Sequence, residues 1–212
     1  MWLALPSTAE ELMASFKAKL RSQIRKGEKN NLRVRIGTTA LLDDFYTVFA
    51  RNMRDLGTPV YGRALFRSIL DAFPESARIV VVTDDKGKPL AGGFLLGYRD
   101  RIEIPWASSL REYNHLQANM WLYWNCLQYA CECGYRFFDF GRSTRGESTF
   151  KFKEQWGAQP VPHYWHYHLE GGRELPGLNL RNPKFSLAIQ VWQRLPLALT
   201  RLLGPFIVKH LP

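Results

Sequence analysis

The spacing of hydrophobic positions predicts a helix at the start of the chain. Two overlapping capping boxes at residues 7–11 precede apolar residues that recur every three or four positions. We expect this helix to run to about Lys26 and to end at Gly27.

The pattern after this helix alternates between helical and strand-like segments. It first predicts strand 32–36, helix 41–56 ended by Gly57 and Pro59, and helix 63–72. Strands 79–83, 90–98 and 102–107 follow, and then helix 114–133, with Asn114 as its N-cap and Gly134 as its end. The last predicted elements before residue 170 are strand 135–140, helix 149–155 and strand 162–169. Three consecutive antiparallel strands followed by helix, strand, helix and strand predict an α/β (α+β) fold with a mixed central sheet flanked by helices.

The last segment, residues 183–212, has a helical pattern that we expect Pro196 and Pro205 to interrupt. Its mixture of basic and apolar residues suits the interfacial region of a membrane, but packing against the domain is the interpretation we favour. We therefore divide the chain into one domain over residues 1–170 and a basic helical extension over residues 171–212.

Charge changes this picture because it is unevenly distributed. The 212 residues carry a formal net charge of +10, and residues 17–35 contain eight Lys or Arg against one acid, Glu28. This density suits a phosphate-bearing partner: nucleic acid such as tRNA, a nucleotide-linked or envelope-precursor substrate, or an anionic membrane face. A solvated helix face is the competing interpretation.

Cysteine and histidine positions argue against a metal site. Three cysteines in one helical segment have neither zinc-site nor redox-pair spacing, and His163, His166 and His168 have no neighbouring Cys or acidic ligand. Reduced thiols, the missing signal-peptide pattern and the absence of an apolar run of about eighteen residues predict a cytoplasmic protein. If the extension binds lipid, we expect the protein to associate with the inner face of the membrane.

Candidate chemistry gathers where strand 135–140 ends at Gly141. Basic and hydroxyl side chains follow at once, and such strand ends commonly carry binding and catalytic groups. They are Arg142, Ser143, Lys151 and Lys153. We expect a site there for a phosphate or a developing oxyanion.

Several stretches together resemble the FemAB-like branch of the GNAT acyltransferase fold, specifically FemAB-related proteins associated with exosortase/PEP-CTERM systems. The matching stretches are 19–25, 45–60, 104–109, 119–120, 122–124, 138–143 and 152–158, and the most specific are Asn52-Met-Arg-Asp-Leu-Gly-Thr-Pro59 and Phe140-Gly-Arg-Ser143. The resemblance covers nearly the whole chain. It implies a GNAT-like fold, and it implies that this chain corresponds to the second of the two halves that FemAB-type enzymes carry.

The resemblance also implies where the acyl donor enters, between splayed parallel strands 102–107 and 135–140. Coenzyme A donors need a glycine-rich turn before the following helix, so that backbone N–H groups can hold the pyrophosphate. Residues 108–114 contain no glycine. We therefore expect no resident cofactor and a donor such as aminoacyl-tRNA, with acetyl-coenzyme A less favoured.

Individual roles follow from the resemblance and from side-chain chemistry. Lys153, with Lys151 as second choice, is the candidate catalytic cation for the oxyanion, and Asp139 is either a base or a cap for the following turn. We expect substrate contacts from a set at the strand ends and the short helix: Trp106, Ser108, Arg142, Ser143, Lys151 and Trp156. For Trp106 a core position is the stronger interpretation.

The prediction is an acyl or aminoacyl transferase that forms an amide bond on a cell-envelope (peptidoglycan) or exopolysaccharide-related acceptor. A GNAT N-acetyltransferase using acetyl-coenzyme A is one alternative. A non-catalytic module that binds a phosphate-bearing ligand is the other.

Overall fold

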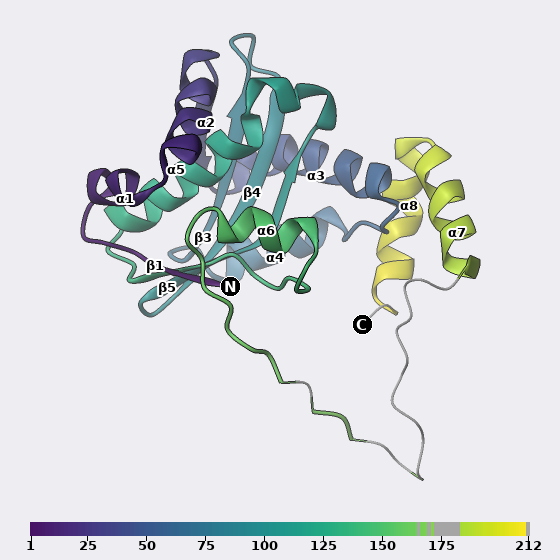
Figure 1. Cartoon of the computed structure of the whole chain (residues 1–212). Coiled ribbons are helices and arrows are strands. Elements are labelled where there is room, and N and C mark those ends of the chain that lie inside the picture. Colours follow the sequence, from purple (N-terminus) through teal and green to yellow (C-terminus); the bar gives the residue numbers. More distant parts are fainter. Residues whose placement is uncertain (165, 169–170, 172–182, 211–212) are drawn as a thin grey trace.

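The computed structural model describes residues 1–164, 166–168, 171 and 183–210. Within this part, six strands form one sheet in the order β1-β6-β5-β4-β3-β2. Their bounds are β1 (Trp2–Ala4), β2 (Arg33–Gly37), β3 (Ala77–Thr83), β4 (Pro89–Tyr98), β5 (Arg101–Ser109) and β6 (Phe137–Asp139). Only β5 and β6 pair in parallel. This is the mixed sheet of a GNAT-like fold, as the sequence predicts (Figure 1).

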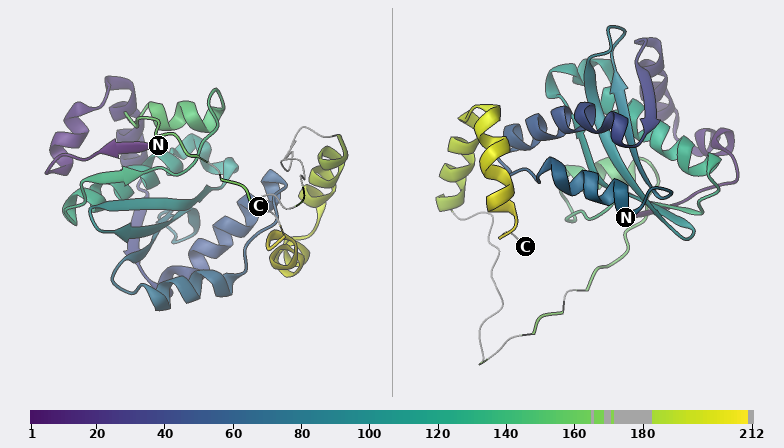
Figure 2. Two further views of the ribbon diagram at one scale, coloured as in Figure 1. Left: turned by 90° about the horizontal axis from the view of Figure 1, so that it is seen from below. Right: turned by 180° about the vertical axis from the view of Figure 1, so that it is seen from behind.

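Helices cover both faces of the sheet and enclose two hydrophobic clusters (Figure 2). One face carries α1 (Ala9–Ser15), α2 (Ala18–Lys29), α5 (Ala118–Glu132) and α6 (Ser148–Glu154); the other carries α3 (Leu42–Leu56) and α4 (Arg63–Ala72). Strands β3 and β4 are buried on both faces, and their continuous apolar sequences reflect this double covering.

The first predicted helix is divided, and Gly27 does not end it. Phe16 adopts an extended conformation between α1 and α2, where its side chain is buried. Gly27 lies inside α2, and a Cβ built there would approach the Trp121 Cβ to 2.8 Å. The glycine therefore permits close packing of α2 on α5, which propensity alone cannot reveal.

The start of the long helix also differs from the prediction. A 3-10 helix, η2 (Arg111–Leu116), precedes α5, and Gln117 with φ of 61° stands at the N-cap position instead of Asn114. Asn114 lies within η2, where its carbonyl accepts the Gln117 N–H. The strand predicted over 162–169 is wrong for the positions that the structure describes there, because none of them pairs with the sheet.

The C-terminal extension forms α7 (Pro183–Arg194) and α8 (Leu197–Val208), which pack against the C-terminal end of α3 and the loop after it. The chain turns at Pro196 as predicted, but Pro205 lies inside α8. Its ring packs near Gly62, and the helix continues through it. The favoured packing interpretation is confirmed for one side of these helices.

Candidate functional site

A cleft opens where β5 and β6 stop pairing. Their parallel register runs from Arg101 opposite Phe137 to Glu103 opposite Asp139, and β5 then continues alone to Ser109. The two strands predicted to splay apart are therefore neighbours that separate.

A bulge in β5 coincides with this separation. Phe94 pairs with Trp106 and Leu96 with Glu103, so two residues of β5, Ile104 and Pro105, face a single residue of β4. A bulge bends its strand, and proline cannot donate a ladder hydrogen bond. Both effects prevent further pairing with β6.

The cleft has two connected flanks that share Ala107, Tyr123, Thr149 and Lys153. The flank toward β6, about 470 Å³, is lined also by Glu103, Ile104, Pro105, Trp106, Phe140, Gly141 and Arg142. The flank toward α5, about 410 Å³, is lined also by Asn52, Ser108, Ser109, Asn119, Ser148 and Phe152. Charged groups thus lie at the β6 flank, and hydroxyls and amides at the α5 flank.

Lys153 is a buried amine at the junction of the two flanks. Its side chain is 7% exposed, and its Nζ donates to the carbonyl oxygens of Gly141 at 3.2 Å and Arg142 at 2.9 Å. Burial lowers the pKa of Lys153 from 10.5 to about 8, although the Asp139 and Glu103 carboxylates oppose this by favouring the charged form. An amine with such a pKa in a cleft is typical of a functional group.

The Asp139 carboxylate is held by several donors. Its Oδ1 accepts the Gly141 backbone N–H at 2.8 Å, its Oδ2 accepts the Trp2 indole N–H at 2.8 Å, and the Met1 amino nitrogen lies 3.5 Å from Oδ1. This is the geometry of a turn cap at Gly141, which has φ of 72°. The alternative role of Asp139 as a base stays a prediction.

Besides Arg142 at the β6 flank, two further predicted residues line the cleft. Ser108 is 3% exposed, and its Oγ accepts the Asn52 side-chain amide at 3.0 Å. Trp106 packs edge-on against Phe66 and Phe94 in the core, and it also lines the β6 flank. Its position is therefore compatible with both a core role and a contact to substrate.

The remaining predicted residues lie elsewhere. Trp156 is 1% exposed and packs against Phe16 in the core, and the substrate contact expected of it stays a prediction. Lys151 is exposed, whereas Lys153, two positions along the same short helix, is buried. Ser143 lines a separate hollow of about 340 Å³, and its buried Oγ has no hydrogen-bond partner in the part of the chain described.

Sequence reasoning missed several residues of the cleft, notably Glu103, Asn119 and Thr149. Burial, and then the neighbouring Asp139 carboxylate, raise the pKa of Glu103 above its ordinary value. Its register opposite Asp139 is the signal that identifies it, and that register appears only in the folded sheet. Asn52, which lies in one of the specific sequence blocks, was not assigned a role.

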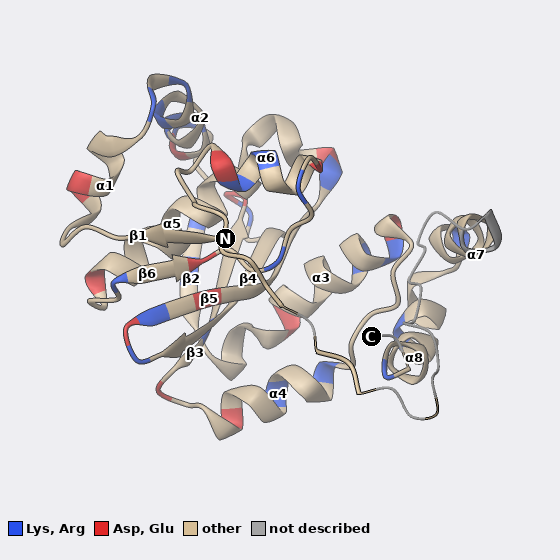
Figure 3. Cartoon of the chain, turned by 60° about the horizontal axis from the view of Figure 1, so that its bottom comes forward, with Lys and Arg blue, Asp and Glu red and all other residues tan. Residues whose placement is uncertain are grey.

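The basic region predicted over 17–35 lies mainly on α2 (Figure 3). Arg21, Arg25, Lys26 and Lys29 line a groove of about 450 Å³. The Asn30 amide donates to the Leu116 carbonyl at 3.0 Å, which ties this region to the chain entering α5. None of the residues that line this groove lines either flank of the cleft.

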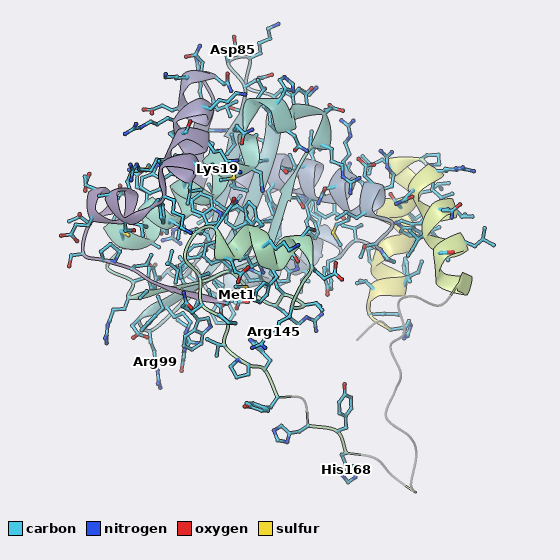
Figure 4. All side chains as sticks on the ribbon, in the orientation of Figure 1. Met1, Lys19, Asp85, Arg99, Arg145 and His168 are labelled. Atoms are coloured by element: carbon cyan, nitrogen blue, oxygen red, sulfur yellow. The ribbon has the colours of Figure 1, made fainter. Side chains whose placement is uncertain are left out.

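The described histidines of the 163–168 region are exposed, and Figure 4 shows His168 on a segment that leads away from the sheet. No group of three or more His, Cys, Asp or Glu side chains is placed to hold a metal ion among the residues that the structure describes. In the same part of the chain, no helix is both long and apolar enough to cross a membrane.

A family model described as an acetyltransferase (GNAT) domain matches residues 14–154. No curated protein matches the sequence.

Solved structures share the fold at low sequence identity. FemX aligns with a TM-score of 0.67 and 16% identity over 74% of this chain and 58% of its own. The C-terminal domain of a putative lysylphosphatidylglycerol synthetase from Agrobacterium fabrum aligns with a TM-score of 0.52 and 16% identity, over 69% of this chain and 55% of its own. An aminoglycoside acetyltransferase from an uncultured soil metagenomic sample aligns with a TM-score of 0.53 and 12% identity, over 67% of this chain and 99% of its own. The chain thus spans a little over half the length of the first two.

Proposed function

We propose that this acyltransferase transfers an aminoacyl group to an amine on an envelope- or exopolysaccharide-linked acceptor. The chain belongs to the acetyltransferase (GNAT) domain family, and the proposal starts from that membership. One observation carries the proposal: the buried Lys153 amine stands where β5 and β6 separate. The resemblance of stretches 138–143 and 152–158 to FemAB-like transferases, and the structural likeness to FemX, support the aminoacyl choice. The exosortase/PEP-CTERM association stays a prediction from sequence.

The reaction requires three changes at the cleft. The acceptor amine attacks the donor carbonyl carbon, the carbonyl oxygen becomes a transient oxyanion, and the bond to the donor's ester oxygen then breaks. The amine loses its proton and the departing alcohol gains one, so an amide and a free hydroxyl result. A Lys153 ammonium near the oxyanion would stabilise it, and removal of such a donor typically costs about 10²–10³ in rate.

Two features favour an aminoacyl-tRNA donor over coenzyme A. The connection from β5 to α5 contains no glycine, and it forms η2 rather than an open turn before the helix. In addition, the α2 groove provides four basic side chains suited to a phosphate backbone. Likeness to aminoglycoside acetyltransferases keeps acetyl-coenzyme A as the second candidate.

The first test is binding. The chain is titrated by calorimetry and thermal shift with coenzyme A, a nucleotide-linked peptidoglycan precursor and aminoacyl-tRNA. We expect binding of the aminoacyl-tRNA and of the precursor. Binding of coenzyme A alone would refute the aminoacyl proposal.

The second test is transfer activity in variants of α6. Lys153→Met should lower kcat/KM by about 10²–10³, whereas the exposed Lys151→Met is the matched control and should leave it unchanged. Wild-type transfer should fall as pH rises through about 8, because the ammonium is lost. Full activity in Lys153→Met would remove Lys153 from the mechanism.

A further inference from the structure

Helix α8 presents its more apolar side to solvent. Residues turned toward the domain recur at helical spacing: Leu197, Thr200, Arg201, Gly204, Pro205 and Val208. The exposed residues between them are all apolar: Ala198, Leu199, Leu202, Leu203, Phe206 and Ile207. Phe206 is 64% exposed and Leu202 is 62% exposed. A surface helix normally shows the reverse arrangement.

Docking of α8 on the domain does not use this exposed side. Gly204 allows the helix backbone to approach Val60, since a Cβ built there would lie 2.8 Å from the Val60 backbone. The Arg201 guanidinium lies 5.6 Å from the centre of the Tyr46 ring. The outer apolar side is therefore available after α8 has packed, and Figure 2 shows α7 and α8 projecting at the end of α3.

The charged residues of the extension itself have one sign. From Pro183 to Pro212 the sequence has four Lys or Arg and no Asp or Glu. Lys209 lies beside the apolar side, with its Nζ 5.8 Å from the centre of the Phe206 ring. On α7, Leu187 and Val191 add exposed apolar surface, at 65% and 54% exposure.

We propose that the outer side of α8 docks onto the surface of a bilayer that contains anionic phospholipid. An apolar helix side bordered by basic residues without acids matches the acyl–headgroup boundary of such a bilayer. Twelve residues of helix extend only about 18 Å, so α8 lies along the surface. This orientation holds the acyltransferase domain at the membrane, and the inference does not depend on the identity of donor or acceptor.

The test is sedimentation of the 212-residue chain with vesicles of phosphatidylcholine alone and of phosphatidylcholine with 30% phosphatidylglycerol. We expect binding to the anionic vesicles that weakens with added salt. The double variant Leu202→Ser/Phe206→Ser should bind roughly 100-fold less, on the order of tenfold for each side chain. The control is Leu65→Ser/Phe73→Ser, which removes an exposed Leu from α4 and an exposed Phe from its C-cap position and should bind like wild type.

A charge variant separates the electrostatic part. Arg194→Gln/Lys209→Gln should bind the anionic vesicles roughly 30-fold less while keeping the thermal stability of wild type. The proposal is overturned by equal binding of Leu202→Ser/Phe206→Ser and wild type, or by no binding of wild type to anionic vesicles. If the wild-type protein is instead a dimer that does not bind vesicles, and Leu202→Ser/Phe206→Ser dissociates that dimer, the surface belongs to a contact with a second copy of the chain.

Discussion

Replacement of Lys153 by methionine tests the electrostatics of the cleft independently of any substrate. The side chain is 7% exposed, and its amine donates to two backbone carbonyls. Methionine has a similar length and can lie in the same space without charge. The variant therefore separates the cost of burying an ammonium from the benefit of packing.

The magnitude follows from the pKa of Lys153, which burial lowers from 10.5 to about 8. That difference corresponds to about 3 kcal/mol of unfolding free energy. Below pH 8 both states hold the proton and the folded state bears the full cost. Between about pH 8 and 10.5 only the unfolded state holds it, so this contribution to stability rises with pH. From pH 7 to pH 9 the rise is about 1.3 kcal/mol.

The assay is urea unfolding of wild type and Lys153→Met at pH 7 and pH 9. Buried tyrosines and cysteines with raised pKa values also respond to pH, but they are common to both proteins and cancel in the difference. At pH 7 the variant should be as stable as wild type or more stable, because relief of the buried charge offsets two lost hydrogen bonds of about 1 kcal/mol each. Its advantage should shrink by about 1.3 kcal/mol at pH 9.

The control is Lys151→Met, whose exposed side chain should give the same stability difference at both pH values. A difference between wild type and Lys153→Met that does not change with pH would refute the reasoning. It would mean that the Lys153 ammonium is solvated in the folded protein.

Three further substitutions test positions that the fold constrains. Gly27→Ala should lower the unfolding free energy by about 1–3 kcal/mol in urea titrations, because its Cβ would lie 2.8 Å from the Trp121 Cβ. Gly57→Ala should detach α7, measured as faster proteolysis after residue 160, since φ is 77° there and a Cβ would lie 2.4 Å from Ile189 Cγ2. Asp139→Asn should cost about 1–3 kcal/mol, measured by thermal unfolding, because it weakens hydrogen bonds at both carboxylate oxygens.

Gly57→Ala has two matched controls. Gly87→Ala and Gly134→Ala share positive φ with Gly57 but have no atom within 4 Å of the built Cβ. They should therefore cost only the backbone strain of about 1 kcal/mol. Equal effects at Gly57 and Gly134 would show that α7 does not pack where the structure places it. A Gly27→Ala variant as stable as wild type would show that α2 does not pack on α5 as closely as the structure places it.

Local periodicity and turn residues predicted α3, α4 and β3 to β5 within two residues at each end, because amphipathic spacing and glycine or proline ends are local properties. The same local rules failed at Gly27. There a contact with α5, distant in sequence, decides the conformation.

For the candidate site, the residue types and their place after a strand end can be predicted from the sequence alone: a lysine on a short helix after Gly141, and the glycine-free connection before α5. Three further properties depend on the folded protein: Lys153 is buried while Lys151 is exposed, Glu103 stands opposite Asp139, and Trp156 belongs to the core. The reason is that burial, pKa and strand register depend on neighbours brought together from separate segments. A side chain's type can be read from the chain, but its environment exists only after folding.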